Sequence, residues 1–362
     1  MDYEKEYKPG EESPLIEPDP LPRGGTSTPV DRRYAVFFIF GFLGLSSLLP
    51  WNFFITAKEY FDYKFRNTSI VPFDAKHNNT RLQSEFESYL SIVSQCSNLF
   101  FMVLTVLLVR SINVKVRVVV STLLVAVIFV ITTALVKVDT DSWQQAFFFI
   151  TLCLAAFMSG VQSVLTGSIL GLSAMFPPLY SQSAMIGQAA GGTFSALMSL
   201  LTIATGDEPI ASALIYFLIA IGVTVLSLIL FISLHFLKYS KYYMSLQKEK
   251  PLAEINDHVR RKRHSETRME FYCSIFRRIW KHCISICLVF WVTLSVFPAI
   301  CSLIRSSQVV DTPWTVTYFT PVVCFLLFNV GDFMGRLSTF LFKFPGPSRP
   351  GVLLTMSFLR IA

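Results

Sequence analysis

"ASALIYFLIAIGVTVLSLILFISLHFL", residues 211–237, contains no Lys, Arg, Asp or Glu and is apolar along nearly its whole length. A helix of about 20 such residues crosses the ~30 Å hydrocarbon core of a bilayer. Similar runs recur throughout the 362 residues, of which 52% are hydrophobic and only 15% are charged. The sequence therefore predicts an all-α polytopic membrane protein. The expected spans, placed by hydropathy and flanking charge, are 34–57, 86–109, 118–136, 146–175, 183–204, 211–237, 283–304 and 315–342.

These eight full helices are followed by an apolar stub, "GVLLTMSFLRIA", which is too short to cross a bilayer. Residues 1–33 are polar and rich in Pro, so we expect a disordered tail. The long polar segment 238–282 separates an expected six-helix bundle, 34–237, from an incomplete second bundle, 283–362.

The distribution of basic residues predicts that the N-terminus is cytosolic. With that orientation, 22 of the 31 Lys and Arg lie in cytosolic segments and seven lie on the opposite side. The long non-cytosolic loop carries two N-glycosylation sequons, at Asn67 and Asn78, which favours the same orientation. The run "RRKRH", 260–264, belongs to a cytosolic loop in this arrangement, so the net charge of +7 does not indicate a nucleic-acid partner.

Catalytic and metal-binding patterns are missing from the sequence. The five His (77, 235, 258, 264 and 282) lie in loops or at helix ends with no His-Glu pairing at ligand spacing, and no Gly-Lys-Ser/Thr phosphate loop occurs. The seven Cys lie in expected helices or in the basic loop, so no disulfide framework is implied. We expect no cofactor and no metal, and a membrane enzyme is the weakest of the functional hypotheses.

Two opposite charges lie inside the apolar stretch 326–342, at Asp332 and Arg336. Residues four apart share one helix face, and charges at this depth usually pair and face a bundle interior or a watery cavity. One interpretation is a purely structural clamp between helices. We favour a binding role, because Ser or Asn could connect two helices with a lower cost of insertion into the membrane. A carboxylate beside a guanidinium also suits a neutral polyhydroxyl ligand.

Pro50 lies inside the first expected span, and Pro298 lies inside the seventh. Proline-interrupted helices in corresponding positions of two halves are typical of transporter binding sites. Trp51 and Asn52 follow Pro50 directly and would add a flat ring and an amide to such a site. The alternative for Trp51 is the interfacial aromatic belt, since this residue comes late in its span.

Small residues predict close helix contacts. Three G-x-x-x-G motifs occur, at Gly167 and Gly171, Gly187 and Gly191, and Gly331 and Gly335. Gln188 and Gly192 would give the fifth expected helix a narrow polar face. Such surfaces serve tight packing and also allow helices to slide during gating.

The chain resembles the equilibrative nucleoside transporter family from about residue 32 to its end. The resemblance is carried by "LLPWNFFITAKEYF", "ITTALVKVDT", "FPAI", "FNVGDFMGR" and "FPGPS", in this order. Within the family, the likeness is greatest to the late-endosomal and lysosomal member. The resemblance implies a major-facilitator-like fold of eleven helices, alternating access between two bundles, and nucleosides such as adenosine and uridine as substrates.

The resemblance also implies roles for individual residues. Trp51 and Asn52 would line the central cavity, and Asp332 and Arg336 would contact the ribose of the substrate. Gly187 would support the fifth helix.

Two features depart from the family pattern. Thr166, in "SVLTGSILG", stands where the well-studied plasma-membrane member has a glutamine that reads the nucleobase. The second bundle has two helices and a partial ninth instead of five, so we expect a C-terminally truncated form or a fragment. The alternative function is accordingly a truncated isoform that does not transport and acts as a subunit or dominant-negative partner.

The tail carries a candidate sorting signal. "EESPLI", with Glu11 ahead of Leu15 and Ile16, fits the acidic dileucine pattern read by clathrin adaptors. We expect a late-endosomal and lysosomal location, with the plasma membrane and mitochondria as alternatives. An acidic lumen would permit proton-linked transport. Arg336 favours the charged form of Asp332, so Glu85 or Glu87 is the better candidate for sensing pH.

Overall fold

The computed structural model describes residues 29–68, 80–108, 111–205, 209–246, 268–297, 301, 304, 312–342 and 350–360. Within these ranges the secondary structure is entirely helical, as the sequence predicts. The chain forms two compact units. The large unit comprises Val30–Ala253 and Ile304–Thr339, and the small unit comprises Met1–Pro29, Glu254–Leu303 and Phe340–Ala362.

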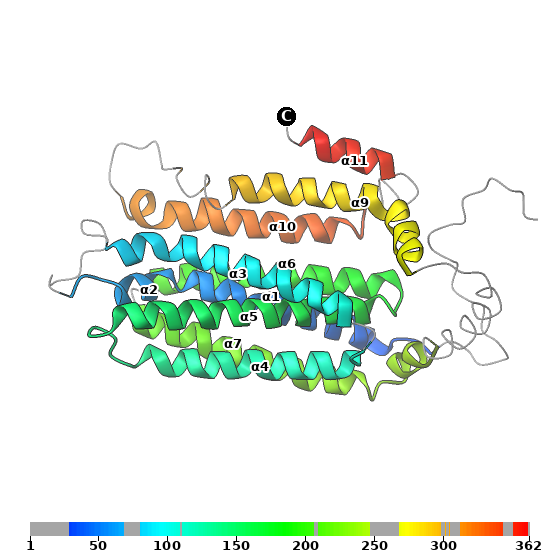
Figure 1. Cartoon of the computed structure of the whole chain (residues 1–362), viewed down its shortest axis with the longest axis horizontal. Helices are drawn as coiled ribbons and strands as arrows, with labels where there is room; N and C mark the ends of the chain where they lie inside the picture. Colours follow the sequence, from blue (N-terminus) through cyan, green and yellow to red (C-terminus); the bar gives the residue numbers. More distant parts are fainter. Residues whose placement is uncertain are drawn as a thin grey trace, which may run out of the picture. The chain divides into compact units, whose positions relative to one another are not determined.

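The helices of the large unit run close to a common axis (Figure 1). A short 3-10 turn, η1 (Arg32–Tyr34), leads into the first long helix. The elements that follow are α1 (Ala35–Thr56), α2 (Lys58–Lys64), α3 (Arg81–Leu108), α4 (Val114–Val136), α5 (Gln144–Ser173), α6 (Pro178–Thr205) and α7 (Pro209–Leu234). The unit also contains the π-helical segments η3 (Trp314–Tyr318) and η4 (Pro321–Leu326), which lead into α10 (Leu327–Ser338).

Seven helices in the described ranges are long and apolar enough to cross a membrane. They correspond to the first six expected spans and to the last one, so the prediction of a polytopic helical membrane protein is confirmed in this respect. The stub at the C-terminus forms α11 (Pro350–Leu359), whose ten residues are too few to cross a bilayer.

The expected span 283–304 differs from the structure. The helix found there, α9 (Arg268–Val296), begins inside the segment expected to be a polar loop, and its apolar part is only Ile279–Thr293. Hydropathy misplaced its start because 268–282 mixes aromatic and apolar residues with basic ones, and such a segment can be helical without being apolar overall. Pro298 lies outside the described residues.

The last expected span, 315–342, is also less regular than the sequence indicates. Its first half consists of η3 and η4, and its α-helical part ends at Ser338. π-Helical turns are frequent at functional sites, and here they directly precede α10, the helix that carries Asp332.

Two buried apolar clusters hold the large unit together. The first contains Phe53 and Phe129 and joins α1 to α4, α5 and α7, with the rings of Phe53 and Tyr216 stacked at 5.5 Å. The second contains Phe40 and Phe176, whose rings meet edge to face at 5.0 Å. Both clusters use residues of α1, so this helix runs through the interior of the unit.

Glycines bring α1 and α6 into backbone contact. A Cβ at Gly187 would overlap the carbonyl group of Gly41, and a Cβ at Gly44 would overlap the carbonyl group of Ala184. At Gly191 a Cβ would lie 3.1 Å from the carbonyl oxygen of Leu45. Only glycine fits at the two tightest positions, because a backbone cannot move aside as a flexible side chain can.

The other G-x-x-x-G motifs have more space around them. A Cβ at Gly171, Gly331 or Gly335 would meet no heavy atom within 4 Å in the described part of the chain. The packing and gating roles expected of Gly331 and Gly335 on α10 therefore stay predictions.

The small unit contains two described helices, α9 and α11, which contact each other.

Candidate functional site

The two intramembrane charges of α10 form the ion pair expected from their spacing. The Nε of Arg336 lies 3.1 Å from each carboxylate oxygen of Asp332, and Nη2 lies 3.1 Å from Oδ2. The side chains are 39% exposed at Asp332 and 28% exposed at Arg336. Each carboxylate oxygen can accept more than one hydrogen bond, so the pair retains capacity to bind hydroxyl groups.

The guanidinium of Arg336 also reaches the neighbouring helix α6. Its Nη1 donates a hydrogen bond of 3.1 Å to the carbonyl oxygen of Met185. One turn further along, Gln182 donates to the hydroxyl of Thr339 at 3.3 Å. Arg336 thus connects the carboxylate on its own helix to a backbone carbonyl of α6.

Farther along the contact between α6 and α10, the hydroxyl of Thr193 on α6 donates to the carbonyl oxygen of Asn329 on α10 at 3.1 Å. Residue numbers increase along α6 as they decrease along α10, so the two helices are antiparallel. This register places Asp332 between the Met185 contact and the Thr193 contact, near the middle of α6.

Gly192 provides space for two amide side chains. A Cβ there would lie 3.2 Å from Cγ of Asn329 and 3.7 Å from Nδ2 of Asn52. The missing side chain therefore lets an asparagine of α10 and an asparagine of α1 come together beside α6. Trp51 is half-buried and packs against the first apolar cluster, and its contact with a substrate stays a prediction.

A second group of polar side chains meets at Ser47 of α1, which is fully buried. Its carbonyl oxygen accepts hydrogen bonds from Nε2 of Gln162 and, at 3.5 Å, from the hydroxyl of Thr166. Its own hydroxyl accepts from Nε2 of Gln188 at 3.4 Å. Polar groups of α1, α5 and α6 are therefore linked within an apolar bundle.

Pro50 affects the turn of α1 that contains this carbonyl. The N–H that it lacks would have bonded the carbonyl of Ser46, four residues earlier. A proline inside a helix removes one N–H from the preceding turn and distorts that turn. Inside a membrane, neighbouring side chains must satisfy backbone groups that lose their partners. Ser47 lies in the turn before Pro50, and the side chains of Gln162 and Thr166 supply donors to it.

Sequence reasoning identified Thr166, Gln188, Asp332 and Arg336 but missed other members of these clusters. Ser47 and Gln162 lie outside the motifs quoted above, and Asn329 lies inside one of them, FNVGDFMGR, without having been singled out. A signal was available for Gln162, which lies four residues before Thr166 and hence on the same helix face.

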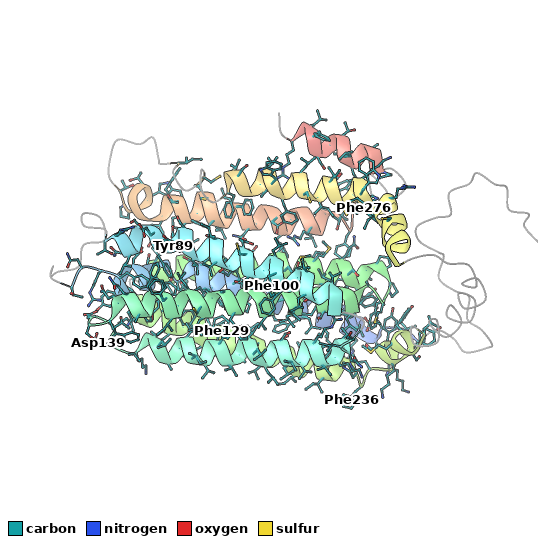
Figure 2. The ribbon with its side chains drawn as sticks, in the orientation of Figure 1. Tyr89, Phe100, Phe129, Asp139, Phe236 and Phe276 are labelled. Atoms are coloured by element: carbon teal, nitrogen blue, oxygen red, sulfur yellow. The ribbon has the colours of Figure 1, made fainter. Side chains whose placement is uncertain are left out.

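The two ends of the large unit are marked in Figure 2 by Asp139 and Phe236, which lie at opposite ends of the bundle. Arg66 pairs with Asp141 at 2.8 Å, which places the neighbouring sequon residue Asn67 at the Asp139 end. Asn67 is exposed.

Other predicted functional residues lie outside the described part of the chain. These are Glu11, Leu15, Ile16, Asn78 and Pro298. Within the described part, no three His, Cys, Asp or Glu side chains come together as a metal site. The structure thus defines a class: a multi-pass helical membrane protein with polar side chains gathered inside an apolar bundle.

Comparison with known proteins gives the family. The family model described as "Nucleoside transporter" matches residues 154–362. Equilibrative nucleoside transporter 3 of Rattus norvegicus is 35% identical over 359 residues, which covers 93% of this chain and 73% of the relative. Equilibrative nucleoside transporter 2 of Rattus norvegicus is 33% identical, covering 88% and 77% respectively. Equilibrative nucleoside transporter 1 of Homo sapiens is 31% identical, covering 88% and 76%.

The chain therefore belongs to the equilibrative nucleoside transporter family. The resemblance seen in the sequence is confirmed. Because this is a family of transporters, the expectation that the chain is not an enzyme is also confirmed.

Proposed function

We propose that this protein carries nucleosides, such as adenosine and uridine, and nucleobases down their concentration gradients by alternating access. Support comes from the family and from the polar clusters on α1, α5, α6 and α10. We further propose the major-facilitator-like arrangement of eleven helices for the complete transporter. In it, 34–237 forms the first bundle, and 283–362 contributes the beginning of the second.

The observation that carries this proposal is the hydrogen bonding of the Asp332–Arg336 pair. The pair contains one acceptor group and one donor group on a single helix face, bonded to each other at 3.1 Å and partly exposed. When the site is empty, the two charges neutralise each other, which limits the cost of keeping them inside a membrane. When a nucleoside enters, its ribose hydroxyls donate to Asp332 and accept from Arg336.

The remaining site residues would surround the rest of the substrate. Trp51 offers an aromatic face, and Asn52 offers an amide beside Gly192. Thr166 and Gln188 are already linked through Ser47 and would line the same cavity from α5 and α6. Pro50, Gly187 and Gly191 would allow the helices to shift without losing contact.

We place the protein in the membrane of late endosomes and lysosomes, with a cytosolic N-terminus and a basic cytosolic segment at 238–282. The signal ending in Leu15 and Ile16 would bind a clathrin adaptor. In this orientation the Asp139 end of the bundle faces the lumen, where Asn67 and Asn78 would be glycosylated. Transport would run from the lumen to the cytosol and would be proton-linked.

The proposal is tested by reconstituting the purified full-length protein in proteoliposomes and measuring counterflow of labelled uridine. Vesicles preloaded with unlabelled uridine should accumulate the label transiently, and external adenosine should compete. Accumulation no faster than in protein-free vesicles would contradict the proposal. If co-expression then also suppressed transport by a related carrier, the alternative of a non-transporting partner would take its place.

A further inference from the structure

Gln162 on α5 has a buried acceptor that nothing in the described structure uses. The side chain is only 5% exposed, and its Nε2 donates to the carbonyl oxygen of Ser47. Its Oε1 is buried and accepts no hydrogen bond from the described residues. A buried acceptor without a donor is costly, and an apolar side chain of similar size would avoid that cost.

The orientation of this amide is fixed by its surroundings. Reversing the amide would place Oε1 against the carbonyl oxygen of Ser47, which can only accept. That carbonyl lies in the turn before Pro50 and also receives the hydroxyl of Thr166 at 3.5 Å. Nε2 therefore stays on Ser47, and Oε1 remains available to a donor from elsewhere.

A second polar group without a partner lies on the same face of α5. Ser159 precedes Gln162 by three residues, is 6% exposed, and its hydroxyl has no hydrogen-bond partner among the described residues. A hydroxyl can donate as well as accept. Together the two side chains offer an acceptor and a donor about one helix turn apart.

The location connects this pair to the proposed cavity. Gln162 and Gln188 both donate hydrogen bonds to Ser47. On α6, Gln188 lies between Met185, whose carbonyl oxygen accepts from Arg336, and Gly192, which leaves space for the side chain of Asn329. Arg336 of the ion pair bonds α6 at Met185, and Gln162 is connected through Ser47 to Gln188, three residues further along α6. A substrate with hydroxyls at one end and a hydrogen-bonding edge at the other matches this arrangement.

We propose that Oε1 of Gln162, assisted by the hydroxyl of Ser159, reads a nucleobase edge that presents an N–H donor beside an acceptor. This inference rests on the proposed function and deepens it. It assigns base recognition to the turn of α5 that precedes Thr166. The imide of a uracil base and the amino edge of adenine both carry such a donor and acceptor.

The test uses full-length protein and compares uridine with 3-methyluridine, in which a methyl group replaces the imide N–H. Both compounds compete against labelled uridine for uptake. Wild-type protein should bind 3-methyluridine about tenfold more weakly than uridine, the loss expected for one hydrogen bond of about 1.4 kcal/mol. Gln162→Met should weaken the binding of uridine about tenfold and leave the binding of 3-methyluridine nearly unchanged. The variant should therefore no longer discriminate between the two compounds. Ser159→Ala should reduce the discrimination to a lesser degree.

Gln83→Met is the matched control. Gln83 is also a buried glutamine whose Nε2 donates to a backbone carbonyl, that of Asp62 at 2.7 Å, but it lies on α3 away from the proposed site. This variant should change protein abundance at most, with wild-type discrimination retained.

Three outcomes would overturn the inference. The first is that the wild-type protein binds the two compounds equally well. This outcome can be observed even if no variant folds. The second is Gln162→Met losing affinity equally for both, and the third is equal effects of Gln162→Met and Gln83→Met. In each case uridine is still transported, so the proposed function survives. A wild-type protein that transports neither compound contradicts the proposed function itself.

Discussion

Gly187→Ala tests the contact between α1 and α6 on which both polar clusters depend. The new Cβ would lie 2.7 Å from the carbonyl carbon of Gly41 and 3.0 Å from the amide nitrogen of Leu45. Ordinary contacts between carbon atoms are about 3.5–4.0 Å, so the two helices must separate by about 1 Å. Overpacking of this kind costs about 1–3 kcal/mol. The hydrogen bond of 3.4 Å between Gln188 and Ser47 would then be lost.

A graded series of alanine substitutions makes the test quantitative. At Gly191 the added Cβ would lie 3.1 Å from the carbonyl oxygen of Leu45, so alanine should cost little stability. At Gly222 the added Cβ would meet no heavy atom of the described residues within 4 Å, so alanine should cost none. Alanine at Gly222 should even gain up to about 1 kcal/mol of helix stability.

The order of stability among these three variants is measured by heating the full-length protein in detergent. Size-exclusion chromatography then gives the fraction that remains folded at each temperature. At about 2–4 °C per kcal/mol, Gly187→Ala should lower the Tm by about 2–12 °C. Uridine uptake per folded molecule should fall as well. If Gly187→Ala were as stable and as active as Gly222→Ala, the close packing of α1 on α6 would be refuted.

Three further predictions concern location and regulation. Replacing Leu15 and Ile16 by Ala should move a tagged full-length protein from lysosomes to the cell surface, and unchanged lysosomal staining would show that the motif is a chance match. Asn67→Gln and Asn78→Gln should each remove one glycosidase-sensitive step in electrophoretic mass, whereas an unchanged mass would argue against a luminal loop. Uridine uptake into proteoliposomes should be faster at lysosomal than at neutral pH, and Glu85→Gln should remove the increase; equal wild-type rates at the two pH values would exclude proton linkage.

Hydropathy was sufficient to locate most of this fold. Seven expected spans recur as helices of membrane-spanning length, because each contains an apolar stretch long enough to be recognised from the sequence without knowledge of its neighbours. The pairing of Asp332 with Arg336 was also predictable, since it follows from spacing within one helix. The start of α9 was not predictable in this way, because the helix begins in a segment where basic and aromatic residues alternate.

Contacts between helices could not be read from the sequence. Ser47, Gln162 and Asn329 lie on three different helices, and whether polar residues of different helices meet depends on the rotation and depth of each helix. The G-x-x-x-G pattern illustrates the same limit. It marks a tight contact at Gly187, yet at Gly331 no described atom lies close enough to need a glycine.

The most direct test of the account measures what the Asp332–Arg336 pair recognises. Asp332→Asn, Arg336→Ala and the double mutant are compared in the full-length protein for transport of uridine and dideoxyuridine, at equal abundance in the membrane. Charge-assisted hydrogen bonds contribute about 1.5–3 kcal/mol, so each single substitution should weaken uridine binding about ten- to a hundredfold.

Dideoxyuridine lacks the 2′ and 3′ hydroxyls of the ribose, so its binding should weaken much less. The double mutant should be no worse than the worse single mutant, because the two side chains act as one unit. Arg66→Gln, which removes a guanidinium from the ion pair with Asp141 at the Asp139 end of the bundle, is the control and should affect neither substrate. Equal losses for uridine and dideoxyuridine in the Asp332 and Arg336 variants would show that the pair only clamps α10 to α6 and does not bind ribose.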